Sequence, residues 1–252
     1  MVIEKGDVPF NDKELQKLRE YAQKSVDRLI QNALSPETNC DGKEWGLPCN
    51  VDKSLKLEVW SSSIPGNSIK MFKAQCIFEE AGPKDVFSFL MNNDKRLEWD
   101  ENVCHLAVTV LSEDKVTGDK LVILNCRTNA VGPISGRDFV DICLWKKSAN
   151  EDGEETYVSA GATYLEEDEI QRKISTLFPT PPGFIRGKNF QGGGWHISAS
   201  KSDGGEGTVV TYGIHSDLAG WFPAVVINNA IAGSYVSFFK NSKNAINTAK
   251  NV

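Results

Sequence analysis

Histidine and paired cysteine motifs are scarce in this chain. Its 252 residues include three histidines and six cysteines, and no two cysteines have the C-x-x-C spacing. None of the histidines lies in the G-x-S-x-G or H-E-x-x-H contexts that mark hydrolases and zinc proteases. We therefore predict no catalytic residue, no metal site and no cofactor. The cysteines are expected to be reduced thiols, with a Cys40–Cys49 disulfide as the alternative in an oxidising compartment.

Positive charge and targeting signals are lacking as well. The net charge is −6, so the chain has neither the general basic footprint of a nucleic-acid-binding protein nor a polybasic membrane anchor. Residues 1–7 contain no apolar run of the signal-peptide type, and no Asn-x-Ser/Thr sequon occurs. These absences predict a cytoplasmic protein that binds no nucleic acid.

One nearly uncharged segment, residues 219–239, is long enough to span a bilayer. Pro223, the Asn228–Asn229 pair, Ser234 and Ser237 make it too polar for an isolated span. We predict that it belongs to a buried amphipathic helix, from about residue 223 to residue 247.

The remaining sequence alternates between helical and strand patterns. Apolar residues recur every three or four positions over about residues 11–34, with Asn11 or Asp12 as the cap, and predict an N-terminal helix. Pro83 begins a short helix, and a helical turn follows at 94–100. Two-residue alternation predicts strands at 55–60, 69–76, 103–111, 120–128, 139–145, 157–164, 195–200 and 209–215. The charged run 166–172 is interpreted as a solvated loop.

This order predicts one α+β domain over residues 1–252. Because nearly every strand connection is hairpin-like, we expect a curved antiparallel sheet of about nine strands. The helices at the two ends of the chain are available to cover one face, and the long C-terminal helix would close an apolar cavity. Glycines 192–194 are interpreted as points of strand curvature rather than as a phosphate loop.

Over about residues 11–251 the chain resembles the START domain family of lipid-transfer proteins, which has the helix-grip fold. The resemblance is carried by five ordered motifs: residues 98–103 (EWDENV), 136–140 (GRDFV), 159–162 (SAGA), 184–189 (FIRGKN, followed by three glycines) and 217–223 (DLAGWFP). The second and fourth look most like the branch that binds sterols and carotenoids. The resemblance implies a monomer that binds one lipid without catalysis, transfers it between membranes and contacts membranes transiently.

The chain departs from the family at polar cavity positions. The acid–arginine pair of the sterol-binding members falls here on Leu124 and Cys143. The choline-cage aromatics of the phosphatidylcholine-binding members fall on Cys126 and Phe139, whereas their arginine and aspartate persist as Arg96 and Asp100. A choline cage needs an aromatic face close to the cation, so these replacements favour a mostly apolar ligand.

The predicted site follows from the resemblance and from the alternation of the strands. The predicted ligand-binding residues are Arg96, Asp100, Leu124, Cys126, Thr128, Phe139, Asp141, Cys143, Tyr212, His215, Val225 and Asn229. The predicted lid and membrane contact consist of Val131, Pro133, Ile134, Trp221 and Phe222, within the loop 130–135 and the start of the last helix. Arg137 and Asp138 are interpreted as a structural pair that holds this loop.

Three alternatives stay open at this point. A phospholipid headgroup, or a ceramide, is the alternative to a sterol or carotenoid, and Arg96 with Asp100 would meet that headgroup. A hydrolase or isomerase site in the cavity would use His215, Tyr212 and Asp141. A lipid sensor or scaffold would bind the same ligand and signal through a partner.

Overall fold

The computed structural model describes residues 9–79, 81–130, 134–149, 153–200, 207–220 and 223–250. Helix α1 (Asp12–Leu34) begins at a capping box, in which Asn11 and Glu14 each accept a hydrogen bond from the other's backbone N–H. Its apolar face, which includes Leu18, Ala22 and Leu29, is fully buried. The predicted N-terminal helix is therefore present, and Asn11 is its cap.

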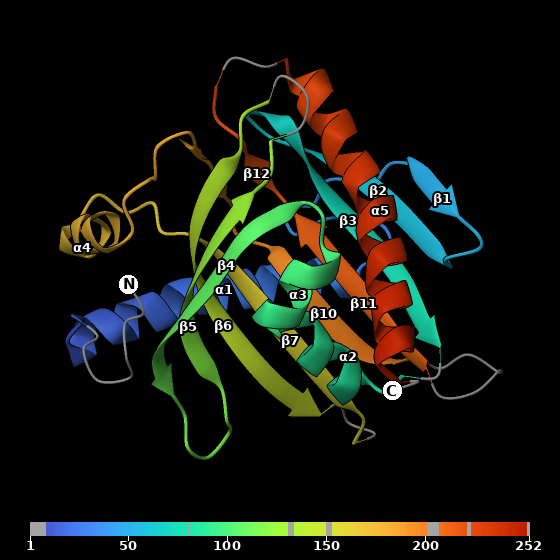
Figure 1. The fold of residues 1–252 in the computed structure, drawn as a ribbon, viewed down its shortest axis with the longest axis horizontal. Coiled ribbons are helices and arrows are strands. Elements are labelled where there is room, and N and C mark those ends of the chain that lie inside the picture. Colours follow the sequence, from blue (N-terminus) through green and yellow to red (C-terminus); the bar gives the residue numbers. More distant parts are fainter. Residues whose placement is uncertain are drawn as a thin grey trace.

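A large sheet occupies the middle of the molecule (Figure 1). Its main path runs β1-β2-β3-β11-β10-β7-β6-β5-β4, with antiparallel pairing throughout, and short β8 pairs in parallel with β6. A separate two-stranded sheet joins β9 and β12. The strands are β1 (Asn50–Asp52), β2 (Leu57–Ile64), β3 (Asn67–Glu79), β4 (Val103–Glu113), β5 (Lys120–Thr128), β6 (Arg137–Ala149), β7 (Glu155–Thr163), β8 (Ile185–Arg186), β9 (Lys188–Asn189), β10 (Gly193–Ser200), β11 (Gly207–Ile214) and β12 (Ser216–Asp217).

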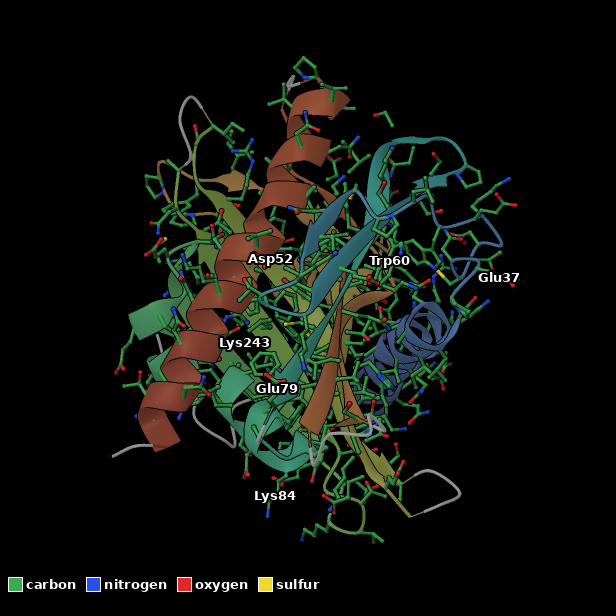
Figure 2. All side chains as sticks on the ribbon, turned by 90° about the vertical axis from the view of Figure 1, so that its right-hand side faces the viewer. Glu37, Asp52, Trp60, Glu79, Lys84 and Lys243 are labelled. Atoms are coloured by element: carbon green, nitrogen blue, oxygen red, sulfur yellow. The ribbon has the colours of Figure 1, made fainter. Side chains whose placement is uncertain are left out.

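The two long helices lie on opposite faces of this sheet. Helix α5 (Ala224–Lys250) packs with α2 (Pro83–Leu90) against β2, β3 and β11, and α3 (Asn93–Trp99) lies beside them. Helix α1 packs against β6 and β7 from the other side, and Figure 2 shows the strands between the two helices. The expectation that both end helices would cover one face is therefore wrong: each face of the sheet is apolar and receives its own helix.

Strand β6 shows how one sequence serves both faces. Val140, Ile142 and Leu144 are buried in the cluster around α1. Their neighbours Phe139, Asp141 and Cys143 point to the α5 side, because successive strand residues face opposite sides of a sheet. The register Leu124↔Asp141 and Cys126↔Phe139 brings the matching face of β5 beside them.

The interpretation of residues 166–172 as a solvated loop is wrong. Helix α4 (Glu169–Leu177) begins there, with the side chain of Asp168 accepting a hydrogen bond from the Gln171 N–H. Ile170 and Ile174, four residues apart, are buried against the α1 cluster. Only this narrow apolar stripe is covered, and the charged residues between its members are outside.

Glycine allows two close backbone approaches near the middle of the sheet. A Cβ at Gly194, which has φ +132°, would lie 2.2 Å from the carbonyl oxygen of Ser159. A Cβ at Gly161 would lie 2.3 Å from Sγ of Cys143. Gly193 and Gly194 therefore belong to strand β10, as predicted, whereas Gly192 lies in the turn before it.

In the described part of the chain, no helix combines the length and apolarity that crossing a bilayer requires. The segment that raised this question is part of α5, whose Ile227, Ile231, Tyr235 and Phe239 are buried against the sheet.

Candidate functional site

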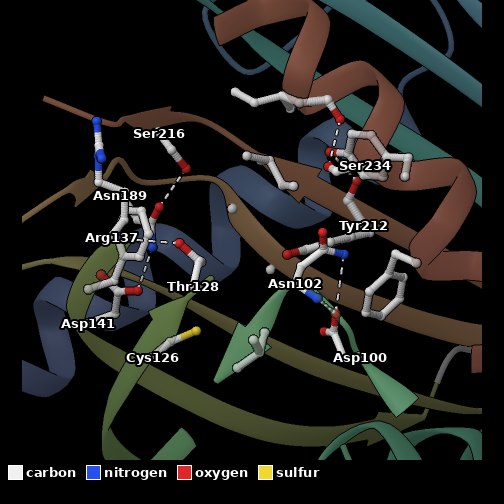
Figure 3. A pocket seen from close by; sticks show the side chains of 18 of the residues that line it. Asp100, Asn102, Cys126, Thr128, Arg137, Asp141, Asn189, Tyr212, Ser216 and Ser234 are labelled. Atoms are coloured by element: carbon white, nitrogen blue, oxygen red, sulfur yellow. Dashed lines mark hydrogen bonds between the residues drawn. The ribbon is translucent and has the colours of Figure 1, made fainter. Parts of the chain in front are cut away.

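A cavity of about 490 Å³ lies between the α5 side of the sheet and helix α5. Apolar residues form much of its lining, among them Leu106, Leu124, Cys143 and Ile231. Polar side chains gather in two groups on opposite sides, which Figure 3 shows. The volume is within the range of roughly 300–1,000 Å³ that small-molecule pockets occupy.

The first polar group, the Arg96 end, is a buried ion pair beside aromatic rings. Nε of Arg96 donates to Oδ2 of Asp100 at 3.1 Å, across one turn of α3. Asp100 also accepts from the backbone N–H of Asn102 at 3.2 Å. The guanidinium lies 5.7 Å from the ring centre of Trp195 and 5.5 Å from that of Phe238. This end therefore holds one cation, one anion and aromatic faces.

Tyr212 adds a hydroxyl to the Arg96 end. Its ring stacks on Trp195 with a centroid separation of 3.7 Å. Burial raises the pKa of the Tyr212 hydroxyl to about 12, and the nearby Arg96 only partly opposes this. The phenol is therefore neutral at physiological pH and is both a donor and an acceptor of hydrogen bonds.

The second polar group, the Asp141 end, is built around a buried carboxyl. Oδ1 of Asp141 accepts from the Thr163 hydroxyl at 2.8 Å, and Oδ2 accepts from Nδ2 of Asn189 at 2.7 Å. Asn189 in turn accepts from the Ser216 hydroxyl at 2.5 Å. Burial raises the pKa of Asp141 to about 6, although Asn189 and Thr163 oppose the shift. The short β9–β12 sheet positions Asn189 and Ser216 here.

Arg137 fixes the chain before α5 to the start of β6. Its side-chain nitrogens donate to the backbone carbonyls of Leu218, Ser135 and Ala219. Asp138 faces the other way and forms ion pairs with Arg127 at 3.2 Å and Arg186 at 2.7 Å. Arg137 therefore holds the end of the loop, as predicted, whereas Asp138 faces the opposite side of the strand and pairs with other residues.

Ten of the twelve predicted ligand-binding residues line the cavity. They are Arg96, Asp100, Leu124, Cys126, Thr128, Phe139, Asp141, Cys143, Tyr212 and His215. Val225 and Asn229 do not line it, and both are exposed. Asn229 precedes the cavity residue Ile231 by two positions, which is about 200° around a helix. The prediction that the helix face with Val225 and Asn229 meets the cavity is therefore wrong.

Of the five residues predicted to form the lid, the structure describes one. Ile134 lines the cavity next to Ser135. Val131, Pro133, Trp221 and Phe222 lie outside the described residues.

Several lining residues were not predicted from the sequence. The α5 side contributes Ser234, Tyr235, Ser237 and Phe238, and the Asp141 end includes Asn189 and Ser216. The spacing of the α5 residues could have been found by taking Ile227 and Ile231 as the centre of the apolar stripe. Asn189 and Ser216 lie in two-residue strands, which are too short for sequence alternation to predict which side chain faces the cavity.

The three residues of the enzyme alternative are held by different partners. His215 lies 3.2 Å from Nδ2 of Asn67 through its Nε2 atom and packs against the Phe190 ring at 4.6 Å. Burial lowers the pKa of His215 to about 4, so its imidazole is neutral. Tyr212 belongs to the Arg96 end and Asp141 to the other end of the cavity (Figure 3).

A curved antiparallel sheet, a long C-terminal helix and a cavity between them define the class of helix-grip proteins with an internal site. Within that class, the family model for the START domain matches residues 41–251. The chain belongs to the START domain family.

Curated relatives carry the same family name. The mouse StAR-related lipid transfer protein 5 is 28% identical over 188 residues, which cover 74% of this chain and 78% of the relative. The steroidogenic acute regulatory protein of Xenopus laevis is 25% identical over 227 residues, which cover 88% of this chain and 70% of the relative.

Solved structures agree on the fold. The structure of human StAR-related lipid transfer protein 5 matches with a TM-score of 0.67 and 18% identity, covering 93% of this chain and 99% of that one. Human STARD10 matches with a TM-score of 0.56 and 15% identity, covering 94% and 80%. At these identities the likeness shows the fold alone.

Proposed function

We propose that this protein binds one hydrophobic lipid in the cavity and carries it between membranes without chemical change, and that the lipid is a sterol or a carotenoid. Membership of the START family supports lipid binding, and the names of the relatives include lipid transfer. The observation that carries the proposal is the cavity itself, which has a largely apolar lining and lies under α5.

The character of the lining favours a largely apolar ligand. The positions that would hold the acid–arginine pair are Leu124 and Cys143, which both face the cavity. Burying apolar ligand surface there contributes about 25 cal/mol per Å². A polar ligand atom left without a partner would cost roughly 1–3 kcal/mol. A rigid hydrocarbon skeleton with few polar atoms satisfies both conditions.

A phospholipid is the second candidate, and one specific observation favours it. The buried Arg96–Asp100 pair at one end of the cavity is a zwitterionic partner of the kind that a headgroup could meet. The ring of Phe238 lies 5.5 Å from the Arg96 guanidinium, so this ring already makes a cation–π contact within the protein.

We infer that the lipid enters where the loop 130–135 approaches the start of α5. Arg137 joins the end of this loop, at Ser135, to Leu218 and Ala219, which precede α5 in the sequence. Val225 and Val226 are exposed on the first turns of α5, with 68% and 42% of their surface accessible. An exposed apolar turn beside the cavity suits brief contact with a bilayer by a cytoplasmic monomer.

The test is native mass spectrometry of the purified chain, followed by organic extraction and identification of the bound lipid. One sterol or carotenoid per chain is the expected result. One phospholipid per chain would select the second candidate. A chain that stays empty after incubation with vesicles containing all three lipid classes would contradict the proposal.

A further inference from the structure

The charges around the cavity are unevenly compensated. The charged residues among the described lining are Arg96, Arg137, Asp100 and Asp141. Arg96 and Asp100 neutralise each other, and the nitrogens of Arg137 donate to three backbone carbonyls. Asp141 receives hydrogen bonds from Thr163 and Asn189, which are both neutral.

Within the described residues, no cation forms an ion pair with Asp141. Arg186 influences its carboxyl through space, but the Arg186 guanidinium is bound to Asp138 at 2.7 Å and to the carbonyl of Phe178. Asp141 is 5% exposed. Among the described residues, the carboxylate is therefore a buried anion whose hydrogen bonds come from neutral groups.

An ionised carboxylate can only accept hydrogen bonds, and it has about four lone-pair positions. In Asp141 each oxygen uses one of them, for Thr163 or for Asn189. Each oxygen therefore keeps an acceptor position for a hydrogen-bond donor of a ligand in the cavity, which Asp141 lines. Hydrogen bonds to an ionised acceptor are roughly twice as strong as neutral ones. A ligand carboxylate, sulfate or phosphate would bring a second anion to the same place.

We propose that Asp141 accepts a hydrogen bond from a hydroxyl group of the lipid, so that the cavity selects uncharged alcohols over their ethers and over anionic lipids. This inference rests on the proposed function and names the headgroup that the same cavity takes. Asn189 and Thr163 orient the carboxyl toward the alcohol, and the apolar lining of the cavity holds the hydrocarbon skeleton.

The experiment uses three ligands with one skeleton: cholesterol, its 3-O-methyl ether and its 3-sulfate. Their binding to the purified full chain is measured by competition against a fluorescent sterol. For the wild-type chain we expect the alcohol to bind about tenfold more tightly than the ether, as loss of a charge-assisted hydrogen bond implies. The sulfate should bind more weakly than either. If no sterol competes, zeaxanthin is compared with β-carotene in the same way.

Asp141→Asn is the test variant, because it keeps the side-chain shape and removes the charge. We expect the ratio between alcohol and ether to fall severalfold and the sulfate to gain affinity. Asp138→Asn is the matched control, since Asp138 lies three residues earlier on β6, is also buried and faces away from the cavity. The control should keep the wild-type ratio. Thermal melting establishes that each variant is folded.

The outcomes separate this inference from the proposed function. Alcohol and ether that bind the wild-type chain equally would overturn the role of Asp141 while leaving lipid binding intact, and so would a wild-type ratio in Asp141→Asn. Binding of phospholipid alone would overturn the choice of an alcohol. Absence of any lipid binding would overturn the proposed function itself. The wild-type comparison stands even if a variant fails to fold.

Discussion

Asp141 is a carboxyl that the folded protein keeps protonated more readily than the unfolded chain does. Burial raises its pKa to about 6 from an ordinary value of 3.8. The folded state therefore binds the proton more tightly, and the stability that this residue contributes is complete below pH 3.8. That stability is lost as the pH rises through 6.

The corresponding prediction concerns Asp141→Asn, which cannot titrate. Relative to this variant, the wild-type chain should lose stability between pH 4 and pH 6, by an amount on the order of 3 kcal/mol for a shift of this size. Urea unfolding of both chains at several pH values measures the difference. A difference that does not change with pH would show that Asp141 ionises in the fold as it does in water.

Lys73 is a second buried charge, on the other face of the sheet. Its ammonium donates to the carbonyls of Asn32 and Ser35, where α1 ends, and lies 4.5 Å from the Trp45 ring centre and 5.2 Å from that of Trp60. Cations are favoured near the C-terminus of a helix. Burial nevertheless lowers the pKa of Lys73 to about 8.

Because the folded pKa of Lys73 is depressed, the unfolded chain binds its proton more tightly between pH 8 and the ordinary value of 10.5. Across this window, the stability of the wild-type chain should rise with pH relative to Lys73→Met. Lys70→Met, at an exposed position of the same strand, is the control and should show no such trend. Guanidinium unfolding of the three chains in this window decides the matter.

At the scale of elements, the pairing of β5 with β6 places Leu124 and Cys143 on one face, diagonal to each other. The double variant Leu124→Glu with Cys143→Arg would introduce an acid–arginine pair into the apolar lining. We expect sterol affinity to change by tenfold or more, because two charged groups then require partners inside the cavity. Equal affinity in titrations of the variant and the wild-type chain would mean that these residues do not contact the ligand.

Elements with a long and regular pattern could be predicted from the sequence. Strand β5 has the predicted bounds, 120–128, and alternation on β5 and β6 places their cavity residues together. Helix α4 was not predicted because its buried apolar face consists of two isoleucines, Ile170 and Ile174, within a charged segment. The cavity face of α5 was missed because Val225 and Asn229 were placed on it, whereas the apolar stripe that meets the sheet contains Ile227, Ile231 and Tyr235.

The Asp141 end shows a different limit of sequence reasoning. Asp141 could be placed on the cavity face by counting along β6. Its partner Asn189, and Ser216 that donates to Asn189, come from β9 and β12, which pair with each other through two residues each. Such contacts arise from the path of the chain between distant strands, and no local pattern encodes them.

At the scale of the whole molecule, the proposed route of lipid entry would require the start of α5 to separate from the loop 130–135. We predict that Phe222→Asp lowers the rate of lipid transfer between vesicles severalfold, because a charge there would oppose contact with the bilayer interior. Equilibrium affinity for the lipid should change less than the rate. Fluorescence transfer assays with donor and acceptor vesicles measure both, and an unaltered rate would place membrane contact elsewhere.

The two long helices lie on opposite faces of the sheet, so one face (the permanent side) forms a closed core with α1. The other face (the exchangeable side) borders the cavity under α5. Along β6, Val140, Ile142 and Leu144 belong to the permanent side, while Phe139, Asp141 and Cys143 belong to the other. In a mutational scan of this strand, tolerance should therefore alternate residue by residue. Between residues 139 and 144, odd-numbered positions should tolerate substitution better, while even-numbered ones are constrained by the need to remain folded.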